Sequence, residues 1–498
     1  MDDASLRPLL AILVSLVAAG LIAFSGRRPN LRETWSVLAA LTKFGLVASM
    51  VPDVLAGENP EITLFTISPE IAFALKVDAA GILFALSASF LWILTSFYSI
   101  GYMRGLSEHK QTRFFAFLAM CLSATIGLCF SGNLLTFVVF YEVLSLATYP
   151  LVIHEETRDA FAIGRQYLAY AITAGIALVG GTAIIWGLTG TTDFTAGGFL
   201  PEALGQGALL SLFALVLVGF AVKGGLMPLH SWLPDAMIAP TPVSALLHAV
   251  AVVKAGVFGF VRLVGYVFGP ELFHDIGAGP ILAAMAAVTI LLASFIALRK
   301  DDLKARLAYS TVGHLSYIVL GVALLVPQAM LGAAFHMVTH AAMKITLFFC
   351  AGAIYVHTGK KKVSQLDGIG RQMPVTLGAF GVGAVGLAGV PLVGGFVSKW
   401  YLAVGAVDAG MLIFLGVFLV SGLLNAAYLV PIVTRAFFRS SSEHTGFSEA
   451  SLFMVVPIFV TMLLSLLLGI HPDGLFQFFS ISEAIVESVT GTSFTGGE

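Results

Sequence analysis

Five ionisable side chains lie inside long apolar stretches of this sequence: Glu142, Lys223, Lys254, Lys344 and Lys399. Glu142 lies midway along FVVFYEVLSLATYP, and Lys254 lies within LLHAVAVVKAGVFGF. A charged side chain near the centre of a bilayer costs about 2.5–3.5 kcal/mol on insertion scales, so an ionisable residue at such a place indicates a function. Glutamate and lysine gain and lose protons, and the chemistry that they indicate here is proton transfer.

Histidines extend this pattern. His336, His340 and Lys344 are spaced four residues apart, which places them along one side of a helix. A lone buried histidine is usually a structural residue, and we expect this of His314. The predicted proton-translocating residues are Glu142, Lys223, Lys254, His336, His340, Lys344 and Lys399, with His230 and His248 as accessory residues.

Snorkelling is the simpler interpretation of a single cation in an apolar stretch, because a long side chain can lie in lipid while its charge reaches the headgroups. We expect snorkelling of Lys43 and Arg262. The depth and the number of the five residues named first argue against it as their common explanation.

Enzymatic interpretations find little support in the same residues. His336 and His340 have the spacing of a zinc-binding helix, but Met337 stands where HExxH has glutamate. The string His154-Glu155-Glu156 begins such a motif and lacks its second histidine. We find neither a GxSxG motif nor a nucleotide-binding P-loop, and the three cysteines lie in apolar runs without metal-ligand spacing. We therefore predict no catalytic residue, no metal and no cofactor.

The composition defines the elements that carry these residues. Of the 498 residues, 58% are hydrophobic and 11% charged, whereas a soluble domain has about 25% charged residues. Apolar runs of about 20 residues, long enough to cross a bilayer as helices, recur along the chain. We predict one integral membrane domain with fourteen spans and a retained first helix. The spans are 6–25, 35–56, 79–103, 113–131, 133–153, 164–188, 207–227, 241–268, 276–298, 306–326, 329–356, 375–403, 409–437 and 449–471.

Orientation follows from the basic residues, which accumulate in cytoplasmic loops. They occur in alternate loops, around residues 27–32, 104–113, 158–165, 299–306, 360–371 and 435–439. The intervening loops are nearly free of them. We predict a multi-pass protein of the cell inner (plasma) membrane with both termini on the outer, periplasmic side. The formal net charge of −2 and the absence of a basic patch interleaved with aromatics argue against a nucleic-acid partner.

Two spans are interrupted by glycine and proline, one within residues 217–242 and one within 385–402. Broken helices are tolerated in a membrane where protein or water covers the break. The breaks fall five spans apart, and each broken span carries one deep lysine. Paired breaks at corresponding places indicate an inverted-repeat transporter with its ion site near the midplane.

Three strings carry a family resemblance: LHSWLPDAMIAPTPVSALLHAVAVVKAG (229–256), DDLKARLAYSTVGHLSY (301–317) and HMVTHAAMKITLFF (336–349). They resemble signatures of the antiporter-like subunits shared by respiratory complex I, Mrp-type cation/proton antiporters and membrane-bound hydrogenases. The resemblance covers about residues 70–440.

The resemblance implies an all-α fold of about fourteen transmembrane helices with two inverted five-helix repeats, helices 4–8 and 9–13, and broken helices 7 and 12. The corresponding regions are N-terminal helices 1–3 (1–112), the first repeat (113–268), the second repeat (276–437), and helix 14 with the tail (449–498). Glu142 matches the glutamate of helix 5, Lys223 and Lys254 match the lysines of helices 7 and 8, and Lys399 matches the terminal residue of helix 12. The other three predicted residues match the polar side of helix 11.

The function that we predict is a proton-translocating subunit of a multisubunit membrane complex, similar to the D-type subunit of an Mrp-type Na⁺/H⁺ antiporter. The alternative is a proton-pumping membrane subunit of a complex I-type NADH-quinone oxidoreductase or of a membrane-bound hydrogenase. The expected partners are the other membrane subunits, the lipid bilayer, protons and, as exchanged cation, Na⁺. An independent symporter and an inactive scaffold are weaker alternatives, since a scaffold would gain stability by losing its buried charges.

Overall fold

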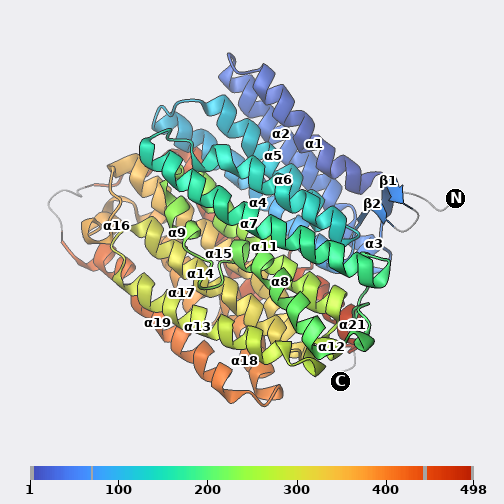
Figure 1. Cartoon of the computed structure of the whole chain (residues 1–498). Helices are drawn as coiled ribbons and strands as arrows, with labels where there is room; N and C mark the ends of the chain where they lie inside the picture. Colours follow the sequence, from blue (N-terminus) through green and yellow to red (C-terminus); the bar gives the residue numbers. More distant parts are fainter. Residues whose placement is uncertain (1–4, 69–70, 441–445, 495–498) are drawn as a thin grey trace.

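The computed structural model describes residues 5–68, 71–440 and 446–494 and is a bundle of long helices that run between two opposite ends (Figure 1). Within these residues, twelve helical segments are long and apolar enough to cross a membrane. They are α1 (Arg7–Phe24), α2 with α3 (Pro29–Ala48, Val51–Leu55), α4 (Ala79–Gly105), α5 (Gln111–Cys129), α6 (Leu134–Val152), α7 (Arg158–Thr189), α8 (Gln206–Gly224), α10 with α11 and the π-helical turn η3 (Thr241–Ala249, Val252–Arg262, Leu263–Phe268), α13 (Ala278–Arg299), α15 (Pro327–Thr358), α19 (Leu412–Phe438) and α20 (Leu452–Ile470).

Two further predicted spans have the expected helices but differ in character. Helix α14 (Leu303–Ala323) has 21 residues and is less apolar, because it carries Lys304, Arg306 and several polar side chains. The span predicted at 375–403 is the broken pair α17 (Pro374–Ala388) and α18 (Gly394–Asp408). Each predicted span thus coincides with helix, and the prediction of an all-α polytopic membrane protein is confirmed. The inverted symmetry of the two repeats, and the division into regions based on it, stay predictions.

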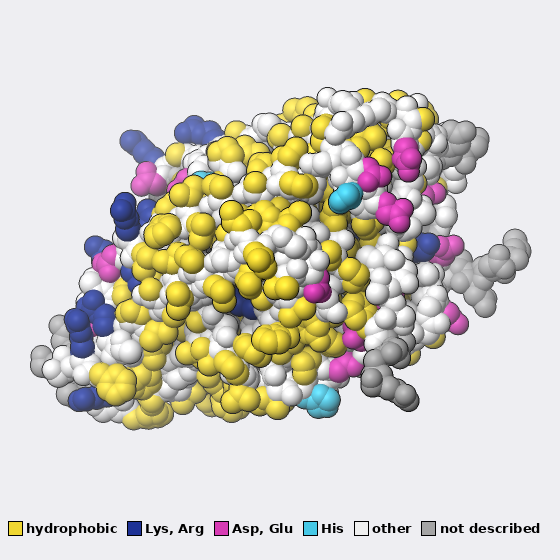
Figure 2. All heavy atoms as spheres, turned by 90° about the horizontal axis from the view of Figure 1, so that it is seen from below, with side chains coloured by type: hydrophobic (Ala, Val, Ile, Leu, Met, Phe, Trp, Pro, Cys, Tyr) yellow, Lys and Arg dark blue, Asp and Glu magenta, His cyan; other side chains and the backbone are white. Residues whose placement is uncertain are grey.

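The two ends of the bundle differ in what they carry. The termini lie at one end, together with a small β-hairpin, α3, α12 (Pro270–Asp275) and α21 (Phe478–Thr490), while α16 (Ile369–Gln372) lies at the opposite end (Figure 1). Figure 2 shows Lys and Arg gathered at the α16 end, Asp and Glu at the terminal end, and hydrophobic side chains over the middle. We call the α16 end the basic end.

The hairpin and α21 were not predicted from the sequence. Strands β1 (Glu61–Ser68) and β2 (Ile71–Lys76) pair antiparallel, with Glu61 opposite Lys76. Helix α21 lies in the region that we predicted as a tail. Its buried residues recur every three or four positions, and one of them, Ile481, is fully enclosed. Such spacing is typical of a short amphipathic helix that packs on a protein surface.

The interrupted helices position the lysines. Both predicted breaks are present: α8 ends at Gly224 before the short helices α9 (Trp232–Asp235) and η2 (Ala236–Ile238), and α17 ends at Ala388 before α18. A third span is interrupted as well, which was not predicted. The span predicted at 241–268 also breaks, because the backbone at Val250 and Ala251 leaves helical geometry. No glycine or proline marks this break in the sequence.

Lys43 and Arg262 do not snorkel, and that prediction is wrong for both. Each is buried inside the protein. The ammonium of Lys43 donates to Ser15 Oγ at 2.5 Å and to the carbonyl oxygen of Leu122 at 3.0 Å. Arg262 forms an ion pair with Asp78, which caps the start of α4. Protein partners far away in the sequence, rather than lipid headgroups, contact both cations.

Candidate proton-translocation site

We call residues 113–268 the first half of the bundle and residues 276–437 the second half. Helix α6 brings Glu142 into the interior of the first half. The residue is half-buried, and its Oε1 atom is enclosed without a hydrogen-bond partner among the described residues. The carboxylate lies against Gly175 of α7, where an added Cβ would stand 2.6 Å from the carboxyl carbon. Glycine at this place therefore makes the room that the carboxylate occupies.

Lys223 lies in the last turn of α8, at the first break, and its side chain is buried. Its ammonium donates a hydrogen bond to the carbonyl oxygen of Tyr141 and lies 3.3 Å from the centre of that residue's ring. Tyr141 directly precedes Glu142 on α6. The lysine and the carboxylate do not form a direct ion pair, but they are close enough to interact electrostatically. A small movement at the break can therefore change how strongly the two charges interact.

Lys254 follows the unpredicted break and stands in the first turn of α11, fully enclosed. Its ammonium lies 3.1 Å from Nδ1 of His340 on α15. Two residues further along α11, Gly256 packs against the end of α8: a Cβ at Gly256 would lie 2.1 Å from the backbone nitrogen of Gly224. This close contact joins the backbone of the Lys223 region to the helix that carries Lys254.

From His340 a row of buried polar side chains continues through the second half. The ring of His340 stacks on His314 with centroids 5.5 Å apart, and His314 Nδ1 lies 3.2 Å from Nε2 of His336. His336 Nδ1 in turn lies 2.8 Å from Oγ of Ser398 on α18. All four side chains are buried.

Lys399 ends this row at the second break. Its ammonium donates to the carbonyl oxygen of Leu387 in the last turn of α17 and lies 5.0 Å from the centre of the Tyr317 ring. Tyr317 stacks on His314 with centroids 5.1 Å apart. We call the set Lys254, His340, His314, His336, Ser398, Tyr317 and Lys399 the polar row.

Lys344 lies on the predicted side of α15 but branches from the polar row. Its ammonium donates to Ser310 Oγ at 2.6 Å, and the hydroxyl of Tyr428 donates to the same oxygen at 2.8 Å. The predicted stripe His336, His340 and Lys344 is therefore one face of α15, and that face meets α14.

Ser398 of α18 was missed as a site residue in the sequence, and so were three residues of α14: Ser310, His314 and Tyr317. They face α15 from α14 and supply its partners. Their spacings of four and three residues put them on one side of a helix, and this spacing was the available signal. The expectation that His314 is an isolated structural histidine does not fit, since it contacts both His336 and His340.

The accessory histidines lie outside the polar row. His230 is half-buried near the first break, with its ring 6.0 Å from that of Tyr309. His248, near the end of α10, is fully enclosed beside Phe348, and neither of its ring nitrogens has a hydrogen-bond partner among the described residues. No contact in the described part of the chain joins either one directly to Lys223 or Lys254.

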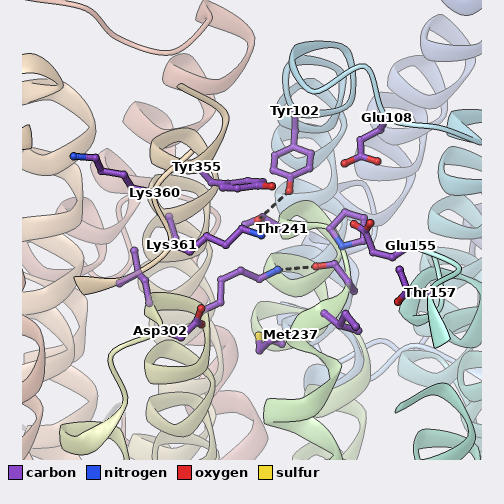
Figure 3. A pocket seen from close by; sticks show the side chains of 16 residues that line it. Tyr102, Glu108, Glu155, Thr157, Met237, Thr241, Asp302, Tyr355, Lys360 and Lys361 are labelled. Carbon is purple, nitrogen blue, oxygen red and sulfur yellow. Dashed lines mark hydrogen bonds between the residues drawn. The ribbon is translucent and has the colours of Figure 1, made fainter. Parts of the chain in front are cut away.

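A cavity of about 370 Å³ opens at the basic end, and Figure 3 shows the side chains around it. Thr241, the first residue of α10, lies in its wall with its hydroxyl 3.4 Å from that of Tyr102. Lys304 and Ala239 also line the cavity, and Lys304 donates to the carbonyl oxygen of Ala239 at 2.6 Å. Burial, and after it the nearby Glu155 carboxylate, raises the pKa of Glu108 at the rim. Helix α10 leads from this cavity to His248 and the break before Lys254.

These features define a class: a polytopic membrane protein with broken helices and buried, mutually contacting lysines and histidines through its middle. The comparisons with known proteins agree with this class. Residues 131–425 match the family described as NADH:quinone oxidoreductase/Mrp antiporter, TM. The matched part is more than half of the chain, and the protein belongs to this family.

Curated relatives include subunits of NADH-quinone oxidoreductases and subunits of cation/proton antiporters. The chain is 33% identical over 359 residues to the N subunit of the NADH-quinone oxidoreductase of Desulforudis audaxviator, covering 70% of each protein. It is 26% identical over 475 residues to the D subunit of the Na(+)/H(+) antiporter of Alkalihalophilus pseudofirmus, covering 94% of this chain and 95% of the relative. It is also 34% identical to the A/B subunit of a probable K(+)/H(+) antiporter of Rhizobium meliloti, of whose length it spans 36%.

Two solved structures share the fold. A chain of the Mrp complex from Dietzia sp. DQ12-45-1b superimposes with a TM-score of 0.84, 23% identity and coverage of 99% of this chain and 98% of that one. A chain of the membrane-bound sulfane sulfur reductase, an archaeal respiratory membrane complex, gives a TM-score of 0.88, 23% identity and coverage of 97% and 98%.

Proposed function

We propose that this protein is a proton-translocating subunit of a multisubunit membrane complex, and that it acts most like the D-type subunit of an Mrp-type Na⁺/H⁺ antiporter. One observation carries the proposal: Lys254, His340, His314, His336 and Ser398 contact one another in an unbroken buried sequence. Burial in the membrane disfavours the charged form of lysine and histidine. Residues that readily exchange protons and touch in series form a path along which a proton can pass.

The first half supplies the switch for this path. Two unit charges about 10 Å apart at an effective dielectric of about 20 interact by roughly 1.7 kcal/mol, enough to shift a protonation equilibrium more than tenfold. Glu142 holds Lys223 protonated while the two are close. Movement at the break after Gly224 separates them, and Lys223 then releases its proton toward Lys254.

Protons enter from the cavity at the basic end and leave at the second break. Thr241 in the cavity wall and His248 are seven residues apart on α10, a rise of about 10 Å. Water at the helix breaks completes the connections between α10, Lys223 and Lys254. Lys399, beside Leu387 at the end of α17, passes the proton to the other side or to a neighbouring protein of the complex.

The basic end faces the cytoplasm in this proposal, and both termini face the periplasm. The support is the gathering of Lys and Arg at one end of the molecule and of Asp and Glu at the other (Figure 2), since loops rich in basic residues stay in the cytoplasm.

Support for the D type is the extent of the match to a D-type relative. The D-type relative matches over 94% of this chain and 95% of its own length. The alternative is a proton-pumping subunit of a complex I-type oxidoreductase or of a membrane-bound hydrogenase, and the 33% identity to an N-type relative favours the first of these. Purification in mild detergent separates the two: small antiporter subunits support the D type, and a NADH-oxidising or hydrogenase module supports the alternative.

Transport in inside-out vesicles tests the proton path. Lys223→Ala abolishes coupled proton movement while the complex still assembles. Lys223→Arg also fails, because a guanidinium does not deprotonate in proteins. Lys300→Ala, at an exposed residue of the basic end, is the matched control and transports normally. Normal transport in an assembled Lys223→Ala complex would refute the proposal.

A further inference from the structure

A second group of titratable side chains stands at the rim of the cavity, apart from the polar row. Glu108 and His109 lie in the loop between α4 and α5, and His154 lies just after α6. One potential ligand atom from each of the three lies within 4.8 Å of the other two. Two imidazoles with one carboxylate is a ligand set that binds Zn²⁺, with the fourth position open to water.

His154 is the residue that points to a ligand. Its side chain is fully enclosed, yet neither ring nitrogen has a hydrogen-bond partner among the described residues. A buried polar atom without a partner is costly, and in native proteins it commonly marks a missing ligand, ion or water. Its ring lies 4.9 Å from that of His109 and 5.7 Å from that of Phe114, centre to centre. The charged groups of Arg113 and Glu156 also stand near it.

Ion pairs and a hydrogen bond connect the two loops that carry the ligands. Lys110, next to His109, lies 2.5 Å from the carboxylate of Glu156, and Arg113 pairs with the same carboxylate. Arg113 also donates to the carbonyl oxygen of His154 at 3.1 Å. The ligands are thus held in position by bonds that do not use their own side chains.

The sequence contained half of this arrangement. The string His154-Glu155-Glu156 begins a zinc-binding motif without its second histidine, and in the fold His109 supplies a second histidine from another loop. The prediction of no metal was based on spacing along the chain, which does not register a ligand that comes from elsewhere in the sequence.

We propose that Glu108, His109 and His154 bind Zn²⁺ at the rim of the cavity at the basic end, and that the bound ion slows proton uptake. Glu108 and Glu155 both line the cavity (Figure 3). Zn²⁺ bound to the Glu108 carboxylate places two positive charges beside the entrance. The metal-binding part stands on the three ligands alone. The inhibitory part rests on the proposed function, because it requires that protons enter here.

Metal binding is tested on the purified complex by competition with a fluorescent Zn²⁺ chelator and by the visible absorption of added Co²⁺. We expect wild type to bind the metal, and His109→Ala and Glu108→Gln to bind it at least about 100-fold more weakly, since a direct ligand should matter no less than the residues that orient it. His109 is exposed, so its replacement leaves the buried packing intact. His274→Ala, at an exposed histidine of the opposite end, is the matched control and binds like wild type. Equal affinity in wild type and His109→Ala overturns the metal site.

Inhibition is tested in inside-out vesicles, with each variant's rate in Zn²⁺ divided by its own rate in chelator. Wild type and His274→Ala should slow as the site fills, and His109→Ala should not. If the complex binds Zn²⁺ through these residues but its proton uptake is not slowed, the metal site stands and the cavity is not the proton entrance. If wild type and His109→Ala are inhibited equally, Zn²⁺ acts elsewhere and the inhibitory part is overturned.

Discussion

The two halves of the bundle differ in the groups that they offer to a buried lysine. In the first half, Lys223 contacts the main chain and ring of Tyr141, and its neighbour Glu142 is a carboxylate. Lys254, on α11 where the first half meets the second, instead contacts His340 of the second half, which leads to further histidines. A carboxylate changes the stability of a nearby positive charge, whereas neutral imidazoles accept and donate protons in turn. The first half is therefore suited to switch and the second half to conduct.

Removing the carboxylate breaks the switch and should have the largest effect. Glu142→Gln keeps the shape that fits against Gly175 but loses the charge. Without it Lys223 loses the carboxylate that favours its protonated form, and we expect proton transport to fall by at least about 100-fold, the scale of losing a positioned proton-transfer group. Transport by reconstituted vesicles measures this. Glu271→Gln, in α12 at the terminal end, is the control and should retain full transport. An active Glu142→Gln complex would mean that the halves do not differ in this way.

Interrupting the polar row tests the conducting half. His336→Ala removes the contacts to both His314 and Ser398, and we expect transport to fall by at least about tenfold, which corresponds to about 1.4 kcal/mol. The loss should be smaller than that of Glu142→Gln, because His314 and Tyr317 still connect to Lys399. His357→Ala, on the same helix but beyond the row, is the matched control. Wild-type rates in His336→Ala would show that the proton bypasses the histidines.

The sequence revealed the switching half more fully than the conducting half, for a physical reason. A lysine or glutamate in an apolar run is expensive wherever it lies, so Glu142 and Lys223 stood out without any knowledge of their partners. Serine, histidine and tyrosine are common in structural roles, and their place in the site depends on which helix faces them. The spacing of Ser310, His314 and Tyr317 indicates a shared helix side, but the partner of Ser310, Lys344, follows only from the packing of α14 beside α15.

The same limit explains the other misjudged residues. Lys43 and Arg262 looked like snorkelling cations because the partner of each, Ser15 or Asp78, lies far away in the sequence. The break at Val250 has no glycine or proline to mark it. Fourteen spans could be predicted because hydrophobicity over about 20 residues is a local property, while a buried ion pair is a property of the packed bundle.

The Lys344 branch should matter less than the row itself. Tyr428 donates a hydrogen bond to Ser310, which in turn receives one from Lys344. Tyr428→Phe removes that bond, together with the hydrogen bond to Asn425 Oδ1, and keeps the ring. We expect proton transport to change by about fivefold at most, since only the bond to Ser310 touches the Lys344 branch and one hydrogen bond contributes about 1 kcal/mol net. Transport measured beside His336→Ala in the same vesicles makes the comparison. An effect larger than that of His336→Ala would move Lys344 from a branch to the main path.

The smallest effect concerns a contact that holds the second half together outside the membrane. Asp367 Oδ1 lies 2.7 Å from Nε of Arg435, and Oδ2 lies 3.4 Å from Nη1 of Arg439, which ties the loop after α15 to the end of α19. The hydrogen bond from Arg435 lowers the pKa of Asp367. Its stabilising contribution is therefore present above the ordinary aspartate pKa of about 3.9 and is lost as the pH falls through the lower value in the folded protein. We expect Asp367→Asn to lower the melting temperature of the purified complex slightly at neutral pH, with proton transport unchanged. The difference from wild type should shrink only when both are melted in strongly acidic buffer, and a difference that already vanishes near pH 6 would mean that Asp367 does not hold this contact.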